Sequence, residues 1–517
     1  MVMVRDLIQR TPHRWIAPLF LLVFLALCVG MSLTKRPWSD EGWFAAAGYN
    51  LAFNGKPGTL VLEPRGYREG IDRYTYWTAP LYYPLQAVWY RVFGFSLFSM
   101  RSLSTFFGLL LILSLYVIAL HLFQDHAVAL LTLMLLSFDY VVVMGASFGR
   151  MDIICSAFGW SAVAAFLLLR NRNLTLALLC GQTLVALSGL THFLGILYFF
   201  AFWILVFWSD RTRLTIKAVL FSFLPYVIGG LAWGAYIMQA PELFISQFGG
   251  NAADGGRLKL LTDPFSAVFK EISDRYLVAY GLASHSAGSS GPVWLKSFVL
   301  FAYLLALVLA ISNERFRSKP GVRISLLLLV LFFVVMTVLD GQKLTYYLLN
   351  IVPLFSAILA AAALYIYKQS SLGKVAATSI ITGIILVQFG GAILKIRSNG
   401  YANQYSPAAE FIRSNSGPGD ITYGSAEIAF ALSFDGQVVD DHWLGYEKDR
   451  TPKFFILEEV YEEALDGRRR DMPEVYSFVM QTLERDYDLV YDKSHYRIYQ
   501  RKRSSAINEP KAETSTH

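Results

Sequence analysis

Long apolar segments recur along this chain and constrain its fold more than any other feature. The chain has 517 residues, of which 55% are hydrophobic and only 16% are charged. Segments of about 17–24 apolar residues are long enough to cross a bilayer as helices. We expect a polytopic α-helical membrane protein with about eleven transmembrane helices. The expected spans are 15–34, 102–123, 127–147, 151–169, 174–190, 192–208, 215–237, 293–312, 324–339, 346–367 and 375–394.

The first apolar segment, 15–34, is too long for the core of a signal peptide and lacks an obvious small-residue cleavage site, so we expect a retained anchor. The three cysteines, Cys28, Cys155 and Cys180, all fall inside apolar segments. This placement indicates free thiols in helices and gives no support to a disulfide framework or a cysteine zinc site.

The charges are distributed unevenly, and their pattern predicts the topology. The chain carries a net charge of +7, yet residues 399–517 hold 21 acidic and only 14 basic residues. The basic excess of the first part lies in the N-terminus and in alternate short connections, which places these in the cytoplasm under the positive-inside rule. We therefore expect a plasma (inner) membrane protein with a cytoplasmic N-terminus, and no nucleic-acid partner. The opposite face receives 35–101, 147–151, 189–192, 238–292, 340–345 and the chain after 395.

Composition also divides the chain into domains. Residues 1–398 form the expected transmembrane domain, with a long aromatic-rich outer loop, 35–101, that contains a surface helix. Residues 399–502 read as a small extracytoplasmic α/β domain, with strands at 454–459 and 487–501. The polar end, 503–517, is expected to be disordered.

Several polar side chains fall at the outer ends of the expected helices, and such a set at one mouth of a bundle is a candidate site. A carboxylate there could take a proton from an acceptor hydroxyl, and cations could balance the charge on a departing phosphate. The donor would then be a membrane lipid that carries a phosphate. The candidates are Asp40, Glu41, Arg150, Asp152, His192, Lys343, Tyr346 and Tyr347.

Each candidate also has a purely structural reading. The Asp40–Glu41 pair could be a solvated helix flank, and the segment from Arg150 to Asp152 an ordinary loop. Lys343 could form an ion pair with Asp340, and His192 is more often a hydrogen-bonding residue at a helix junction. Asp139, inside the third span, has no assigned role.

The order of these motifs resembles the C-type glycosyltransferases, near the branch of protein O-mannosyltransferases and lipid A aminoarabinose transferases. The resemblance implies an inverting hexosyl- or pentosyltransferase that uses a polyprenyl-phosphate sugar and a glycan, lipid or protein acceptor. It implies that Asp40 acts as the general base on the acceptor, next to Glu41. It likewise implies that Asp152 with Arg150 forms a second acidic motif, and that Lys343 with Tyr346 or Tyr347 lies near the donor phosphate. The motifs are SDEGWFAAAGYNLAFNG (39–55), TAPLYYPLQAVWYRVFG (78–94), GRMDIICSAF (149–158), GLTHFLG (189–195) and DGQKLTYYLLNIVPLFSAILAA (340–361).

The chain departs from this family at one position. Relatives often carry a lysine before the proline of the surface helix, whereas here Thr78 and Ala79 precede Pro80. Arg65, Arg68 or Arg73 could replace that cation. Metal use varies among relatives, so a divalent metal ion is compatible with the resemblance, although the sequence shows no clear ligand cluster.

The alternative function is a polytopic transporter or lipid-carrier flippase. Such proteins carry polar residues near the bilayer midplane, often on broken and repeated helices. Here the acidic residues fall at the mouth of the bundle and the sequence shows no internal repeat, so we favour the transferase.

Overall fold

The computed structural model describes residues 15–253, 257, 263–283, 293–441, 443–447 and 451–503. The predicted disordered tail and the N-terminal basic residues therefore lie almost wholly outside the described residues. The chain divides into two compact units. Unit 1 contains 1–33, 76–85 and 98–397, and unit 2 contains 34–75, 86–97 and 398–517.

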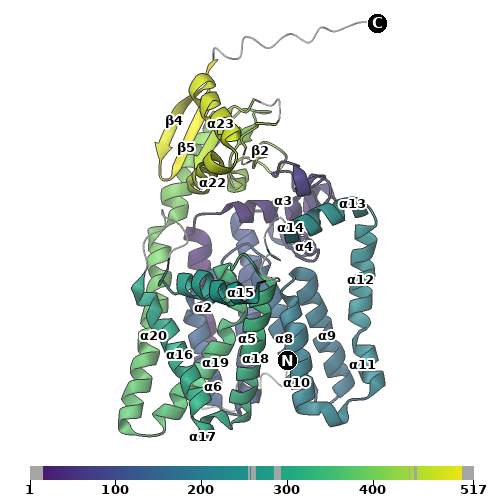
Figure 1. Ribbon diagram of the computed structural model, residues 1–517, viewed down its shortest axis with the longest axis vertical. Coiled ribbons are helices and arrows are strands. Elements are labelled where there is room, and N and C mark those ends of the chain that lie inside the picture. The colour runs from purple at the N-terminus through teal and green to yellow at the C-terminus, as the bar shows by residue number, and fades with distance from the viewer. Residues whose placement is uncertain are drawn as a thin grey trace. The chain divides into compact units, whose positions relative to one another are not determined.

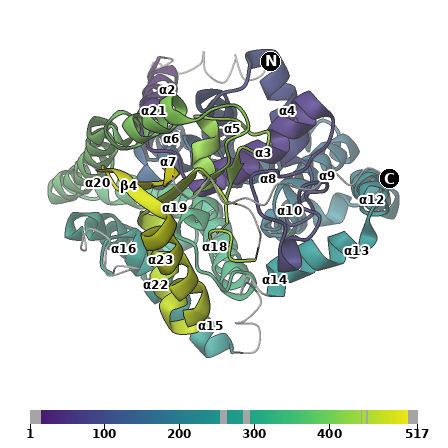
Figure 2. The same ribbon diagram turned by 90° about the horizontal axis from the view of Figure 1, so that it is seen from above.

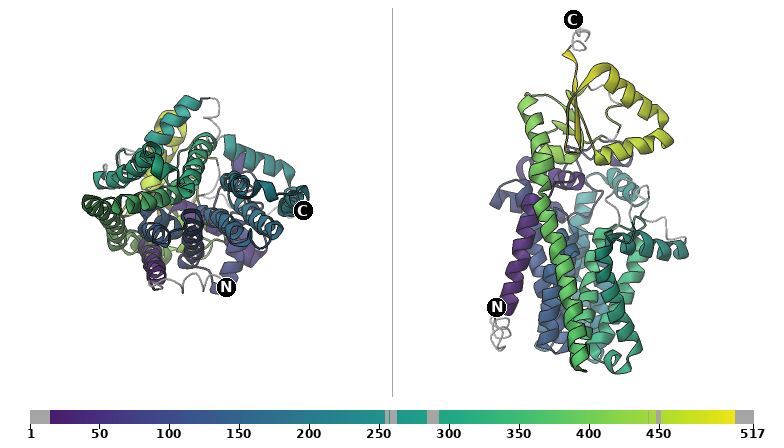
Figure 3. Two further views of the ribbon diagram at one scale, coloured as in Figure 1. Left: turned by 90° about the horizontal axis from the view of Figure 1, so that it is seen from below. Right: turned by 90° about the vertical axis from the view of Figure 1, so that its left-hand side faces the viewer.

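Unit 1 is a bundle of long apolar helices, shown in Figure 1 and end-on in the left panel of Figure 3. Within the described part of the chain, eight helical segments are long and apolar enough to cross a membrane, and a bent pair makes a ninth. Two shorter helices of 16 residues, α10 (Gly195–Asp210) and α19 (Val352–Tyr367), complete the bundle. Each expected apolar segment therefore has a helical counterpart, as a polytopic α-helical fold requires.

The remaining helices of the bundle are α2 (Ile16–Thr34), α5 (Leu97–Phe123), α6 (His126–Phe138), α7 (Tyr140–Ala146), α8 (Asp152–Leu169), α9 (Leu174–Thr191), α11 (Ile216–Ser222), α12 (Leu224–Ile237), α16 (Ser297–Ser312), α18 (Pro320–Leu339) and α20 (Ser371–Ser398). Short helices connect them: η2 (Arg211–Arg213), α13 (Pro241–Phe244), η3 (Ile245–Gly249), α14 (Gly250–Ala253), α15 (Pro264–Lys270), η4 (Glu271–Leu277), η5 (Trp294–Lys296), α17 (Glu314–Arg317) and η6 (Thr345–Asn350).

Asp139 explains the one sharp bend found among the described spans. Helices α6 and α7 meet at an angle of 63°, and Asp139 between them accepts hydrogen bonds from the backbone N–H groups of Val141 and Val142 at 2.9 and 3.0 Å. Gln388 donates to the same carboxylate at 2.8 Å. A break in a membrane helix frees backbone groups that must find partners inside the protein. The Asp139 carboxylate is the acceptor for two of these backbone N–H groups, so its role is to stabilise the bend.

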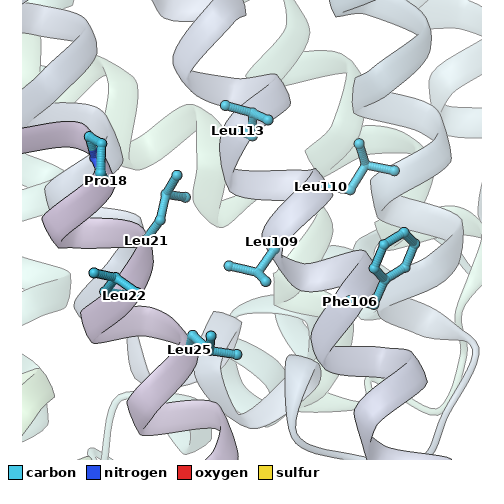
Figure 4. Close-up of a pocket in the computed structure, with 8 residues that line it drawn as sticks. All are labelled: Pro18, Leu21, Leu22, Leu25, Phe106, Leu109, Leu110 and Leu113. Carbon is cyan, nitrogen blue, oxygen red and sulfur yellow. The ribbon is translucent and has the colours of Figure 1, made fainter. Parts of the chain in front are cut away.

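An apolar groove of about 530 Å³ lies between α2 and α5, and Figure 4 shows its lining. Every lining side chain is a hydrocarbon or a proline, so the groove presents no group that could orient a polar ligand. It therefore forms part of the apolar surface of the bundle and stands apart from the polar candidates. The lining residues are Pro18, Leu21, Leu22, Leu25, Phe106, Leu109, Leu110 and Leu113.

Unit 2 is an α/β domain, as the sequence predicts for its C-terminal segment. Its described residues contain one five-stranded sheet in the order β2-β1-β3-β5-β4, with β1 parallel to β2 and β3, and β5 antiparallel to β3 and β4. The predicted strand segment 487–501 forms the antiparallel β4–β5 pair. The strands are β1 (Thr422–Tyr423), β2 (Val438–Val439), β3 (Phe454–Glu458), β4 (Tyr487–Lys493) and β5 (Tyr496–Arg501).

Helices α22 (Glu459–Asp471) and α23 (Pro473–Asp486) supply apolar side chains to the core of the sheet, where Leu465 and Leu483 pack with Phe455 and Tyr487. The burial of such side chains is the main term that stabilises a domain of this size. The other helices of this C-terminal segment are η7 (Tyr401–Tyr405), α21 (Ser406–Asn415) and η8 (Ala426–Phe430).

Most of the segment 35–101 also belongs to unit 2, namely residues 35–75 and 86–97. It contributes α3 (Ser39–Asn54), η1 (Gly66–Arg68) and the part of α4 (Tyr82–Phe93) from Gln86 onward. Helix α3 lies so close to η8 that a Cβ atom on Gly42 would come within 2.4 Å of the Ala426 backbone. Glycine at this position therefore permits the two helices to approach.

Candidate functional site

In unit 1, connections between helices bring polar side chains into one cluster. Arg150 and Asp152 come from the start of α8, and Arg150 Nε donates to Asp152 Oδ2 at 2.8 Å. His192 follows α9, and its Nε2 lies 3.7 Å from Asp152 Oδ1. Tyr347, in η6, lies 3.3 Å from the same nitrogen. The structure therefore brings together several candidates that are far apart in the sequence.

Asp152 keeps one oxygen available inside this cluster. Its side chain is buried, and Oδ1 has no hydrogen-bond partner among the residues that the structure describes. A buried carboxylate oxygen without a partner is costly, because nothing replaces the water it has lost. The arrangement leaves a strong acceptor directed toward His192, where a donor group of a ligand could bind.

His192 is neutral in this environment. Burial lowers its pKa to about 3, against the opposing attraction of Asp152. Its Nδ1 accepts a hydrogen bond from the Leu194 backbone N–H at 3.3 Å, which places the ring proton on Nε2. The distance of 3.7 Å to Asp152 is too long for a hydrogen bond. His192 therefore presents a neutral N–H between Asp152 and Tyr347.

Arg150 carries a firmly held positive charge. Burial alone would lower its pKa, but the Asp152 carboxylate and the nearby tyrosine hydroxyls raise it above its ordinary value. The guanidinium carbon lies 4.3 Å from the centre of the Tyr346 ring, a cation–π contact. Arg150, Asp152 and Tyr346 therefore form one rigid side of the cluster.

Arg257 is a member of the cluster that the sequence analysis missed. One guanidinium nitrogen donates to the Tyr347 hydroxyl at 3.1 Å, and the guanidinium lies 5.3 Å from the centre of the Phe193 ring. Its Nε is buried and makes no hydrogen bond within the described parts of the chain. A buried cationic donor without an acceptor is well suited to bind a phosphate oxygen.

The residue was missed because it lies in the Gly/Ser-rich loop 238–292. A signal was nevertheless present: an arginine on the predicted outer face opposes the positive-inside rule, as Arg150 also does.

Lys343 has a different environment from the one we expected. Its side chain is buried, its ammonium lies 3.1 Å from Glu271 Oε2, and it donates to the Thr337 carbonyl at 2.6 Å. Burial lowers its pKa, while Glu271 opposes that shift. Arg275 bridges Glu271 and Asp340 at 2.7 and 2.5 Å. Lys343 therefore belongs to a buried network of two acids and two bases that fixes the turn before Tyr346 and Tyr347.

Asp40 and Glu41 belong to unit 2, at the start of α3, and the structure separates their environments. Glu41 is fully buried and accepts a hydrogen bond from the Trp38 backbone N–H at 3.3 Å, which completes a capping arrangement at the N-terminus of α3. Asp40 is half-buried. Of the two carboxylates, Glu41 is therefore engaged in starting the helix, whereas Asp40 retains exposed surface.

A metal centre receives no support from side-chain geometry. Among the residues with described positions, no group of three or more His, Cys, Asp or Glu side chains is arranged to hold a metal ion.

Comparison with known proteins agrees with this architecture. Residues 78–235 match the family model of dolichyl-phosphate-mannose-protein mannosyltransferases. Among curated proteins, none matches the sequence.

Solved structures share the fold over nearly the whole chain. ArnT from Cupriavidus metallidurans, bound to undecaprenyl phosphate, matches with a TM-score of 0.59 at 14% identity and covers 96% of this chain and 99% of its own. The archaeal oligosaccharyltransferase AglB from Archaeoglobus fulgidus, in complex with an inhibitory peptide and a dolichol-phosphate, matches with a TM-score of 0.53 at 14% identity, covering 95% of this chain and 75% of its own. The chain is therefore a multi-pass membrane protein with the C-type glycosyltransferase fold, and its residues 78–235 resemble the dolichyl-phosphate-mannose-protein mannosyltransferases.

Proposed function

We propose that the protein is an inverting glycosyltransferase that moves a hexose or pentose from a polyprenyl-phosphate donor to an acceptor hydroxyl at the extracytoplasmic face of the plasma membrane. The acceptor is a glycan, a lipid or a protein. The observation that carries the proposal is that two buried polar atoms, Asp152 Oδ1 and Arg257 Nε, lack a hydrogen-bond partner among the described residues of a protein with this fold. One atom accepts and the other donates, as recognition of a sugar phosphate requires.

In this proposal the cations of unit 1 bind the donor. Arg257, with Tyr347, receives the phosphate and stabilises the charge that remains on it when the sugar departs. Arg257 thereby supplies the cation that the Thr78–Ala79 sequence lacks. Asp152, held by Arg150, accepts a hydrogen bond from a hydroxyl of the sugar, and His192 supports that contact with its Nε2–H.

Lys343 acts in the same site through the turn that it holds. The Lys343 ammonium is engaged with Glu271. We therefore infer that Lys343 positions Tyr346 and Tyr347 near the donor, and that Arg257 contacts the phosphate directly.

Asp40 is the proposed general base. A carboxylate that is partly exposed can accept the proton of the attacking hydroxyl in one step with sugar transfer, which inverts the anomeric carbon. Glu41 supports it by capping the start of α3.

The decisive experiment incubates membranes containing the protein with a panel of labelled polyprenyl-phosphate sugars and follows which label moves, and onto what. The Asp40→Asn variant should lose at least about 10²-fold of the transfer rate, because the base is gone, while insertion and yield stay unchanged. Asp488→Asn, an exposed acid on β4, is the matched control and should transfer normally. Wild-type transfer by Asp40→Asn would exclude Asp40 as the base, and the absence of transfer from every donor would exclude the proposed reaction.

The transporter alternative finds no specific support. The feature that most resembles a transporter is the broken α6–α7 span with Asp139. That carboxylate already accepts hydrogen bonds from two backbone N–H groups, Gln388 and Tyr303. An acid so engaged has no capacity left for a transported ion.

A further inference from the structure

The segment formed by α15 and η4 has three different sides. Phe265, Val268, Phe269 and Ile272 share one side, at the i, i+3, i+4 and i+7 spacing of a helical stripe. Phe265 is 89% exposed and Phe269 71% exposed, so the described residues of unit 1 leave most of both rings uncovered. A stripe of exposed aromatic and aliphatic side chains on a short helix requires an apolar environment.

The second side of the segment packs against the bundle and carries charge. Glu271 and Arg275 are fully buried, and Arg275 binds Asp340 at 2.5 Å. This contact ties the segment to the turn that precedes Tyr346 and Tyr347. The third side is polar, with Lys270 and Asp274 among its residues.

The depth of α15–η4 in the membrane follows from its contacts with the membrane-spanning helices. The Tyr276 ring lies 6.1 Å from that of Phe333 in α18 and 6.3 Å from that of Phe355 in α19. Phe333 is six residues before the end of α18 at Leu339, which corresponds to about 9 Å along the helix axis. A side chain at that level lies within the apolar part of a bilayer about 30 Å thick.

The orientation of α15 is consistent with a position in the membrane interface. Figure 1 shows α15 lying across the long helices, and Figure 2 shows it at the rim of the bundle. Val330 and Val334 of α18 are themselves exposed, as expected for a span that faces lipid. The apolar stripe of α15 therefore belongs to a unit whose α18 also exposes apolar side chains, as a lipid-facing helix does.

We propose that α15–η4 is an interfacial arm whose apolar stripe inserts into the lipid leaflet at the Asp340 end of the bundle. The bound partner is the acyl region of the membrane lipids. A helix with an apolar side, a polar side and an axis in the membrane plane binds in this manner. Through Glu271 and Arg275, the lipid-bound arm holds the Asp340–Lys343 turn of the candidate site. This inference concerns membrane contact and stands whether or not the proposed reaction is correct.

The test measures the depth of two adjacent residues. Phe269→Cys and Lys270→Cys are each made in a Cys180→Ala background and labelled with an environment-sensitive fluorophore. Cys28 and Cys155 are buried, so we expect them to stay unlabelled, and the Cys180→Ala parent is the control for this. The protein is placed in phosphatidylcholine–phosphatidylglycerol vesicles. A nitroxide on the fifth acyl carbon should quench the label at 269 at least twofold more than that at 270, and iodide in the water should show the opposite preference.

Two outcomes would overturn the proposal. Equal iodide quenching at both positions would place the stripe in water. Protection of position 269 from both quenchers would mean that protein, such as a second copy of the chain, covers it. Phe265→Cys and Ser266→Cys provide an independent pair one turn earlier, so a folding defect in one variant leaves the inference testable.

Discussion

At the scale of single residues, the cluster in unit 1 is defined by the atoms that it leaves without partners. Asp152 Oδ1 and Arg257 Nε are both buried and both lack a hydrogen bond within the described structure. Each such atom destabilises the free protein by roughly 1–3 kcal/mol, or more when it carries charge. A ligand that satisfies both would recover that free energy on binding, which is how a preorganised site gains affinity.

The first residue-scale prediction concerns Arg257. Arg257→Gln should lower kcat/KM for the lipid donor by about 10²-fold, because one charged donor to the phosphate is lost. Arg257→Lys should restore only part of that loss, since an ammonium keeps the charge without the planar fork. Steady-state kinetics with varied donor concentration would measure both effects. Arg172→Gln, an exposed arginine of the α8–α9 connection, is the control; an equal loss in that variant would contradict the assignment.

The sequence predicted most members of this cluster but did not predict which side chains contact one another. Arg150, Asp152, His192 and Tyr347 do meet, because helix ends at one mouth of a bundle are close in space. The burial of Lys343 could not be predicted, since its partner Glu271 lies in η4, more than 70 residues earlier, and only tertiary packing brings the two together.

At the scale of elements, Asp440 connects α3 to the sheet domain of unit 2. The Trp43 indole N–H donates to Asp440 Oδ2 at 2.6 Å, the Ala426 backbone N–H donates to the same oxygen at 3.0 Å, and the Tyr461 hydroxyl donates to Oδ1 at 2.5 Å. Trp43 lies one helical turn after Asp40. A buried carboxylate with three donors from three elements fixes their relative positions.

The corresponding prediction is that Asp440→Asn loosens α3. Asparagine keeps the shape but accepts through only one oxygen, so at least one buried donor loses its partner, at a cost of about 2 kcal/mol. For a domain of this size, the Tm should fall by about 4–8 °C. Amide hydrogen exchange in residues 39–54 should accelerate while that of α8 stays unchanged. Unchanged exchange in α3 would show that Asp440 does not hold this helix.

A buried acidic pair in unit 2 predicts a pH dependence. Burial, together with the neighbouring Glu458, raises the pKa of Glu427 to about 8, and Arg36 binds Glu458 at 2.6 Å. One arginine cannot balance two carboxylates, so Glu427 holds a proton in the folded state. In the unfolded chain Glu427 releases that proton near the ordinary pKa of 4.5. Between pH 4.5 and about 8 the native state therefore binds more protons than the unfolded state, so the free energy of unfolding falls as the pH rises through this range.

Thermal unfolding of the full chain should therefore show a higher Tm for unit 2 at pH 6 than at pH 9. Glu427→Gln, which mimics the protonated acid, should remove most of that difference. A variant with the same pH dependence as the wild type would exclude Glu427 as its source.

At the scale of the whole molecule, the continuous apolar segments predicted the spans well, because burial in a bilayer requires continuous apolar length. The sequence did not predict how the segment 35–75 packs. Arg65 binds Asp441 at 2.9 Å and Glu447 at 2.7 Å, and its guanidinium lies 4.0 Å from the centre of the Trp443 ring. These contacts join segments separated by more than 370 residues, and no local pattern encodes such a pairing. Arg65, one candidate to replace the missing lysine, is thereby engaged within unit 2.

The orientation of the whole chain in the membrane is the last prediction. Basic residues gather in the connections such as 313–323, whereas the acidic residues gather after 398, so the former should lie in the cytoplasm and the latter outside. Ser318→Cys and Ser414→Cys, each made in the Cys180→Ala background, place one exposed thiol in each of the two regions. In intact cells, a membrane-impermeant maleimide should label position 414 but reach position 318 only after permeabilisation. Because the candidate residues of unit 1 lie at the opposite end of α18 from Ser318, the reverse labelling would place that cluster in the cytoplasm and contradict transfer at the extracytoplasmic face.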